Sequence, residues 1–454
     1  MIGLSLAAHT LLFFGLCAVL FRRGYANVYS GLFIYLAFHF MVFVQRPLAV
    51  HLFGLDSEFI FMTYWPPDEV FLRTLLVSDI GLLAFVTAYV SALGFRPIAP
   101  TLSLPPVGRA DVLSFGLSAL ILSPLIAYSF FLAFTMRQAY DTDVLFELSK
   151  LNIAIDPTTG ARLLTDTTAY VLFARYMAFP FAIFLIVLMR GRWWSYLPMV
   201  FCLFVALQLG ERWPLIIGAL VAVLVVGYLQ RQTRFRARHY VLLALGLIVF
   251  VVVGQNRNAI LSGDFSLDVS LAQSSFGNHP DFANYEFLAY VVGKVPDASG
   301  TFSYFTQYLG VFTQPIPRAF WPDKPVGSPI NLVNLQAYGR FASRTTSLVG
   351  DGWISLGYAG VVVTLGLVGA FYGRMFHWFC RRDVSIYFFC AHFWVVVLLL
   401  QWARDGSYKI LDFFFFCVGP TILAAGIRRL IGGNAATGSP AQISLPVRPG
   451  GRPA

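Results

Sequence analysis

Charged residues are scarce in this sequence. Asp, Glu, Lys and Arg make up 12% of its 454 residues, whereas hydrophobic residues make up 58%. A soluble globular domain has about 25% charged and about 45–50% apolar residues, so this composition excludes an ordinary soluble fold and indicates a core that faces lipid. The formal net charge of +10 is then interpreted by its position along the chain, and no nucleic-acid partner is expected.

Cysteines and the common catalytic motifs are also sparse. The five cysteines all lie in or beside apolar runs, which argues against a disulfide framework or a thiolate metal site. The patterns His-Glu-x-x-His, Gly-x-x-x-x-Gly-Lys and Gly-x-Ser-x-Gly are missing; they are typical of zinc proteases, P-loop proteins and serine hydrolases. We therefore expect neither a metal nor a cofactor.

Long apolar runs are abundant. About 20 apolar residues are needed to cross the hydrocarbon core of a bilayer, and eleven runs are candidates: 2–21, 28–50, 74–95, 112–135, 168–189, 194–210, 213–229, 239–253, 350–373, 384–401 and 410–427. Only two residues separate the sixth run from the seventh, so the expected range is ten to twelve. The pattern predicts an all-α polytopic membrane protein of about 11 transmembrane helices. The first run is expected to remain as a helix, because its arginines follow the apolar core instead of preceding it as in a signal peptide.

Arginines alternate with carboxylates from one connection to the next. One set of connections contains Arg22, Arg23, Arg96, Arg109, Arg190, Arg192, Arg231, Arg234, Arg236, Arg238, Arg374, Arg381, Arg382, Arg428 and Arg429. The other set contains nearly every Asp and Glu. Because positive loops stay in the cytoplasm, we expect a periplasmic amino terminus and a cytoplasmic carboxy terminus.

The longest polar interruption, residues 254–349, divides the chain. We predict helices 1–8 in residues 1–253, a large periplasmic loop in 254–349 between helices 8 and 9, helices 9–11 in 350–427, and a disordered cytoplasmic tail in 428–454. A loop of this length is usually functional or disordered, and its many aromatic residues argue against disorder. We therefore interpret it as the working face of the protein.

Several charges lie where lipid should exclude them. Asp79, Arg175 and Asp412 fall inside predicted spans, toward the outer end, and ionisable groups in the membrane are functional candidates. A structural pair, for instance Arg175 with Asp79, or a misplaced boundary would also explain them. Glu211 and Arg212 form the whole connection between two spans, which indicates either a simple hairpin turn or an anion-binding arginine at the mouth of a cavity.

Other arginines also return to the outer interface. Arg257 follows the eighth span, and Arg340 and Arg344 precede the ninth. Arginine binds phosphate oxygens bidentately and stays charged when partly desolvated, so a cluster with Arg212 is suited to a lipid-linked pyrophosphate. Ordinary anchoring to phospholipid headgroups is the alternative. His279 is a weaker candidate for a base.

Three segments carry a resemblance to a known family. Residues 317–325 read Pro-Arg-Ala-Phe-Trp-Pro-Asp-Lys-Pro, residues 347–360 contain Gly-Asp-Gly-Trp-Ile-Ser-Leu-Gly-Tyr-Ala-Gly, and residues 209–212 read Leu-Gly-Glu-Arg. Together they resemble the Wzy-type oligosaccharide repeat-unit (O-antigen) polymerases. Asp351 stands where Glu is commoner in that family, and the Arg-x10-Gly loop pattern of some members is missing.

The resemblance implies a GT-C-like glycosyltransferase of the bacterial inner membrane that polymerises undecaprenyl-pyrophosphate-linked repeat units into O-antigen or exopolysaccharide. Membrane lipids, a chain-length regulator and a flippase are the other expected partners. Arg212 and Arg257 are the expected stabilisers of phosphate charge, helped by Arg340 and Arg344, with Asp351 or Glu211 as the base. The expected substrate-binding residues also include Arg318, Lys324, His279, Asp281 and Trp321.

Two other functions remain open at this stage. An O-antigen ligase performs the same chemistry on a different acceptor. A flippase or other transporter of lipid-linked oligosaccharide is the candidate from another class, and we expect it to have intramembrane charges along a path through both leaflets. Here the buried charges favour the outer leaflet, which favours an outward-facing enzyme.

Overall fold

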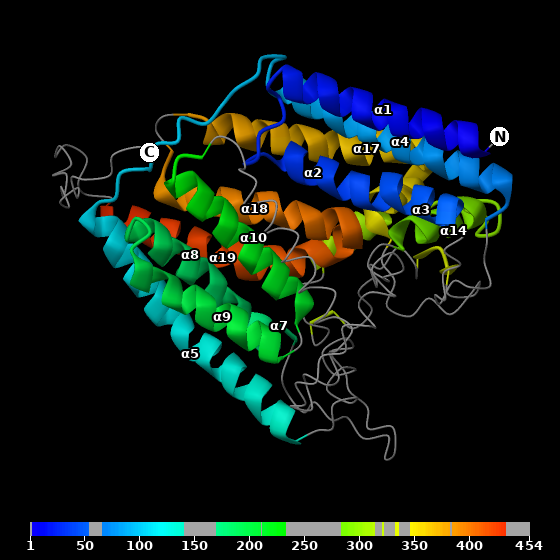
Figure 1. Cartoon of the computed structure of the whole chain (residues 1–454). Helices are drawn as coiled ribbons and strands as arrows, with labels where there is room; N and C mark the ends of the chain where they lie inside the picture. Colours follow the sequence, from blue (N-terminus) through cyan, green and yellow to red (C-terminus); the bar gives the residue numbers. More distant parts are fainter. Residues whose placement is uncertain are drawn as a thin grey trace.

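The computed structural model describes residues 2–53, 66–139, 169–209, 211–232, 283–313, 320–321, 332–335, 346–381 and 384–432. Within these ranges the chain is a bundle of helices with no strand (Figure 1). The helices α1, α4 and α17 lie side by side at one edge, α5 and α9 lie toward the opposite edge, and α18, α10 and α19 lie between them.

The helix bounds follow the apolar runs. They are α1 Ile2–Arg22, α2 Gly31–His39, η1 Phe40–Gln45, α3 Arg46–Phe53, α4 Asp68–Ala92, α5 Arg109–Ala139, α7 Ala169–Phe173, η2 Ala174–Met177, α8 Ala178–Leu188, η3 Trp193–Tyr196, α9 Leu197–Gln208, α10 Arg212–Leu229, α14 Asn284–Lys294, α15 Thr306–Thr313, α17 Ser347–Phe379, α18 Ile386–Asp405 and α19 Ser407–Gly432. Each predicted span within the described residues is mostly helical, and the run 239–253 lies outside them.

The described helices suit a membrane. Eight helical stretches are long and apolar enough to cross one, and two shorter apolar helices, Trp193–Gln208 and Trp213–Leu229, accompany them. The outer helices expose large apolar side chains such as Leu120 and Phe131 on α5 and Phe201 on α9. In water this surface would be unfavourable, so the chain is a multi-pass membrane protein. The predicted total of eleven helices and the GT-C-like architecture stay predictions.

Helices α4 and α17 pack closely because glycines on α17 face the α4 backbone. A Cβ atom added at Gly369 would lie 2.3 Å from the Phe85 carbonyl oxygen, and one at Gly373 would lie 2.5 Å from the Tyr89 carbonyl oxygen. Small residues four positions apart are a common way for membrane helices to approach. This pair therefore fixes α17 against the amino-terminal half of the chain.

The two ends of the bundle differ. The amino terminus and α14 lie at one end, whereas the carboxy-terminal part of α19 lies at the other (Figure 1). Arg22 ends α1, Arg190 follows α8, and Arg231 follows α10; since these helices run away from the amino-terminal end, the arginines gather at the opposite end. The described part of the predicted large loop therefore lies at the end away from these arginines.

Helix α17 is not the single straight span expected at 350–373. Its helical geometry breaks at Leu356 and Gly357, where Gly357 has φ +57°, a value that favours glycine. A Cβ atom added at Gly352 would lie 2.7 Å from the Val361 Cα atom, and one at Gly360 would lie 2.1 Å from the Gly352 carbonyl oxygen. Residues eight or nine positions apart approach this closely only if the chain folds back, so 347–355 is a short helix packed against the start of the long one.

Candidate functional site

A buried ion pair lies at the start of α10. Arg175 of η2 binds Glu211, with the Arg175 Nε atom 3.4 Å from Glu211 Oε2 and a closer contact from Nη2 to Oε1. Each side chain is 9% exposed. The Arg175–Asp79 pair considered from the sequence is wrong, because Asp79 instead lies 2.7 Å from His9 Nδ1. Burying a charge costs far less free energy when it is paired with an opposite charge than when it is isolated.

The local backbone explains the position of Arg175. Helix α7 tightens into the 3-10 turn η2 before α8 begins, and the Ser129 hydroxyl of α5 accepts a hydrogen bond from the Arg175 backbone N–H at 3.0 Å. The same hydroxyl donates to the Leu172 carbonyl at 2.7 Å, and that carbonyl also accepts from the Arg175 guanidinium. These hydrogen bonds hold the Arg175 guanidinium beside Glu211, and the ion pair in turn fixes the start of α10.

Arg212 is the first residue of α10, directly after the ion-paired Glu211. Its neighbour Trp213 lies beneath a second arginine, Arg404, whose guanidinium carbon is 4.4 Å from the Trp213 ring centroid. Arg404 also contacts Asp405 at 2.7 Å. The predicted anion-binding position at Arg212 is thus flanked by one arginine paired with the residue before it and another stacked on the residue after it.

Asp351 lies in the short helix at 347–355 and is fully buried. Its Oδ2 atom accepts a hydrogen bond from the Ser407 backbone N–H at 2.6 Å, and Thr346 donates its hydroxyl to Oδ1. A Cβ atom added at Gly406, where φ is +74°, would lie 2.7 Å from Oδ2. The carboxylate therefore joins α17 to the turn between α18 and α19, and its predicted role as a base stays a prediction.

Part of the predicted loop is fastened to the break in α17. The Ser303 backbone N–H donates to the Ile354 carbonyl at 2.8 Å, and that of Tyr304 donates to the Ser355 carbonyl at 3.0 Å. These are carbonyls whose helical partners the break removes. The Gln307 amide of α15 donates to the Ser355 hydroxyl at 2.5 Å, so the loop segment and the short helix form one unit.

Sequence reasoning missed a second buried ion pair, between Arg46 and Glu286. Arg46 begins α3 and its side chain is 1% exposed, and its Nη2 atom lies 2.6 Å from Glu286 Oε1 on α14. The sequence did contain an indication of this pair, because an arginine inside an apolar run is costly to bury and usually has a partner of opposite charge. On α14 the aromatic side chains of Tyr285 and Phe287 are buried, so they form part of a packed core.

Many of the other predicted site residues lie outside the described residues: Arg257, His279, Asp281, Arg318, Lys324, Arg340 and Arg344. Trp321 is described and is 41% exposed, next to Phe320 at 83%. For Arg212 and Asp412 the backbone is described but not the side chain. The structure thus brings together the Arg212 position, Glu211 and the neighbourhood of Asp351, and Arg404 and Asp405 are the additional charges found there.

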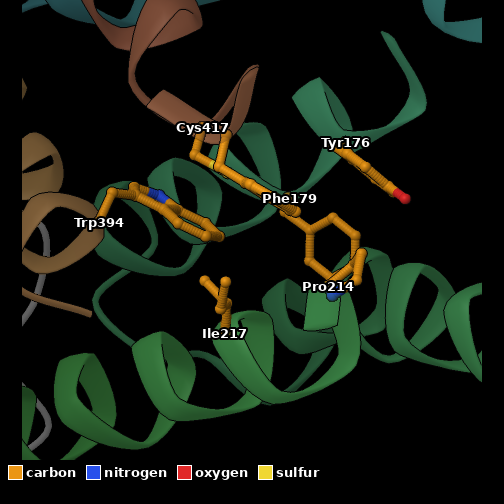
Figure 2. A pocket seen from close by; sticks show the side chains of 7 residues that line it. Tyr176, Phe179, Pro214, Ile217, Trp394 and Cys417 are labelled. Carbon is orange, nitrogen blue, oxygen red and sulfur yellow. The ribbon is translucent and has the colours of Figure 1, made fainter. Parts of the chain in front are cut away.

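A small apolar cavity lies just inside this charged region. It is lined by Tyr176, Phe179, Pro214, Ile217, Trp394, Phe413 and Cys417, which come from η2, α8, α10, α18 and α19 (Figure 2). Tyr176 follows Arg175 in the chain, and Pro214 follows Trp213, so the cavity adjoins both arginine contacts on the membrane side. Among the described side chains, His, Cys, Asp and Glu nowhere gather in threes as metal ligands.

Fold and site together define a class: a multi-pass helical membrane protein with paired and stacked arginines at the end of the bundle that carries α14. No family model, no curated protein and no solved structure matches the chain.

Proposed function

We propose that this protein is a glycosyltransferase that polymerises undecaprenyl-pyrophosphate-linked oligosaccharide repeat units. One observation carries the proposal. The end of α18 and the start of α19 contact one segment of polymerase-like sequence and the residue that follows another, because the Ser407 backbone binds Asp351 and Arg404 lies over the ring of Trp213, which directly follows residues 209–212. Two motif segments distant in the chain therefore meet at one place, as the parts of a single site must.

The charges there suit the chemistry. In the reaction, the hydroxyl oxygen of one repeat unit attacks the anomeric carbon of the growing glycan, and the bond from that carbon to the diphosphate breaks. The electron pair leaves with the diphosphate, whose developing charge arginines stabilise, while a carboxylate takes the hydroxyl proton. The ion pair of Glu211 with Arg175 fixes the start of α10, and we assign the phosphate to Arg212, the first residue of that helix.

The proposal includes an orientation. Since the connection arginines Arg22, Arg190 and Arg231 gather at the end of the bundle away from α14, the positive-inside rule places that end in the cytoplasm. The amino terminus, the loop segments and the candidate site then face the periplasm of a bacterial inner membrane. Undecaprenyl-linked substrates would arrive there from a flippase, and a chain-length regulator is the expected partner for the product.

A complementation experiment tests the function. A strain lacking the gene receives the wild-type chain, Arg212→Ala or Arg212→Lys, and the length distribution of its surface glycan is measured. We expect the alanine variant to abolish long chains and the lysine variant to restore them only in part, because a point charge cannot replace the planar fork. Normal ladders from Arg212→Ala at normal protein levels would refute this site.

The same strain separates the alternatives. Loss of a polymerase leaves single repeat units on the surface lipid, whereas loss of a flippase leaves none. A ligase is distinguished with purified protein, because a ligase transfers glycan to lipid A core while a polymerase elongates with repeat units alone.

A further inference from the structure

Arg404 differs in setting from the other described arginines at this end of the bundle. It lies in the last turn of α18, its side chain is 19% exposed, and its guanidinium stacks on Trp213, the neighbour of Arg212. Arg46 and Arg175, in contrast, are almost fully enclosed around a carboxylate. Of these three arginines, Arg404 therefore has the most exposed side chain.

Helix stability alone does not require an arginine at this position. A positive charge in the last turn of a helix interacts favourably with the helix dipole, and an ion pair with Asp405 at 2.7 Å adds to that effect. Lysine would serve both purposes. Stacking on an aromatic face while presenting N–H groups at the edge of the plane is the property that distinguishes arginine.

The surroundings hold Arg404 in this position. The Gln401 amide donates to Asp405 Oδ2, which keeps that carboxylate oriented, and the Asn284 side chain of α14 donates to the Arg404 carbonyl at 2.9 Å. The guanidinium is thus held by Trp213 of α10 and Asp405 of α18, while Asn284 of α14 holds the Arg404 backbone. Preorganisation reduces the entropy that an arginine loses when it binds an anion.

We propose that Arg404, held over the Trp213 ring, is a diphosphate-binding residue that acts beside Arg212. The inference rests on the proposed function, since it assigns the diphosphate of the lipid-linked substrate to this arginine. A diphosphate carries several acceptor oxygens, so it binds the planar fork bidentately while Asp405 continues to orient the guanidinium. The same chemistry would suit the phosphate of an ordinary phospholipid headgroup, which the experiment must distinguish.

The test measures binding to the full-length protein in nanodiscs. Inorganic pyrophosphate is titrated into wild type, Arg404→Ala, Arg404→Lys, Trp213→Phe and Trp213→Ala, with thermal unfolding recorded for each. We expect about tenfold weaker binding of pyrophosphate by Arg404→Ala and Trp213→Ala, a loss that corresponds to about 1.4 kcal/mol of binding free energy. Arg404→Lys should also weaken binding with little change in unfolding temperature, and Trp213→Phe should keep most of the affinity because it retains an aromatic face.

Arg73→Ala is the matched control. Arg73 lies in an exposed pair with Glu69 on α4, so its removal should leave pyrophosphate binding unchanged. A second arm compares nanodiscs containing undecaprenyl diphosphate with nanodiscs containing only phosphatidylglycerol. Pyrophosphate displaced by the first but not by the second supports the proposal, whereas equal displacement by both identifies a general headgroup site and overturns it.

Three outcomes separate this inference from the proposed function. If Arg404→Lys binds pyrophosphate like wild type, or if wild type does not bind it, the inference fails. If repeat-unit polymerisation depends on Arg212 but is unaffected by Arg404→Lys, the inference fails and the polymerase survives. If pyrophosphate binding depends on Arg404 while no repeat units are joined, the binding site survives and the polymerase proposal fails.

Discussion

Separating Arg175 from Glu211 should destabilise the protein more than removing both charges. In Arg175→Met the Glu211 carboxylate stays buried without the Arg175 guanidinium, and in Glu211→Gln that guanidinium stays buried without a carboxylate. Both side chains are 9% exposed. Leaving one charge of a buried pair uncompensated costs about 3–5 kcal/mol, whereas replacing both is often nearly neutral. The double variant Arg175→Met/Glu211→Gln should therefore recover most of the stability lost in the single variants.

The assay is a double-mutant cycle on the apparent free energy of unfolding, measured by titration with denaturing detergent. We expect a coupling energy of at least about 2 kcal/mol, above the usual range for independent sites. Arg73→Ala serves as the control, because its pair with Glu69 is exposed and should contribute less than about 1 kcal/mol. Single variants that unfold like wild type would contradict the burial argument and show that water reaches the pair.

Three further predictions use the same assay. Gly360→Ala should lower the free energy of unfolding by about 1–3 kcal/mol through overpacking, whereas Gly366→Ala, where an added Cβ meets open space, should leave it nearly unchanged. Equal effects of the two substitutions would contradict the folded-back α17. Asp351→Ala should lower the free energy of unfolding by about 1–3 kcal/mol, since the buried Ser407 N–H loses its acceptor, and an unchanged stability would contradict these hydrogen bonds. Arg46→Met should make α14 sensitive to added protease, and Arg46→Met/Glu286→Gln should restore resistance; a resistant single variant would exclude the ion pair.

The sequence predicted those parts of the fold that depend on composition and local order. Apolar runs of membrane length predicted the helices, because each run must satisfy its own backbone hydrogen bonds in lipid. The alternation of charges put Arg22, Arg190 and Arg231 on one side of the membrane, and these arginines lie at one end of the bundle. The pair at 211–212 was recognised as an unusual connection, and the structure places it in a charged cluster.

The sequence could not predict which distant residues would meet. Arg175 had several possible partners, and only the three-dimensional packing selects Glu211 over Asp79. Arg404 attracted no attention because a basic residue at the end of an apolar run is ordinary, and its stacking on Trp213 depends on how α18 crosses α10. The break in α17 could not be predicted either. Glycines are common in membrane helices, and their spacing alone does not show where a helix folds back on itself.

The separation of Arg46 and Glu286 has a consequence for biogenesis. The two residues are 240 positions apart, and at about 5–20 residues per second the ribosome needs roughly 10–50 seconds to make the stretch between them. The second hydrophobic segment therefore enters the bilayer long before its counter-charge exists. During that interval the guanidinium must remain at the hydrated interface or inside the insertion machinery, so the final seating of α3 is a late step of assembly that waits for α14.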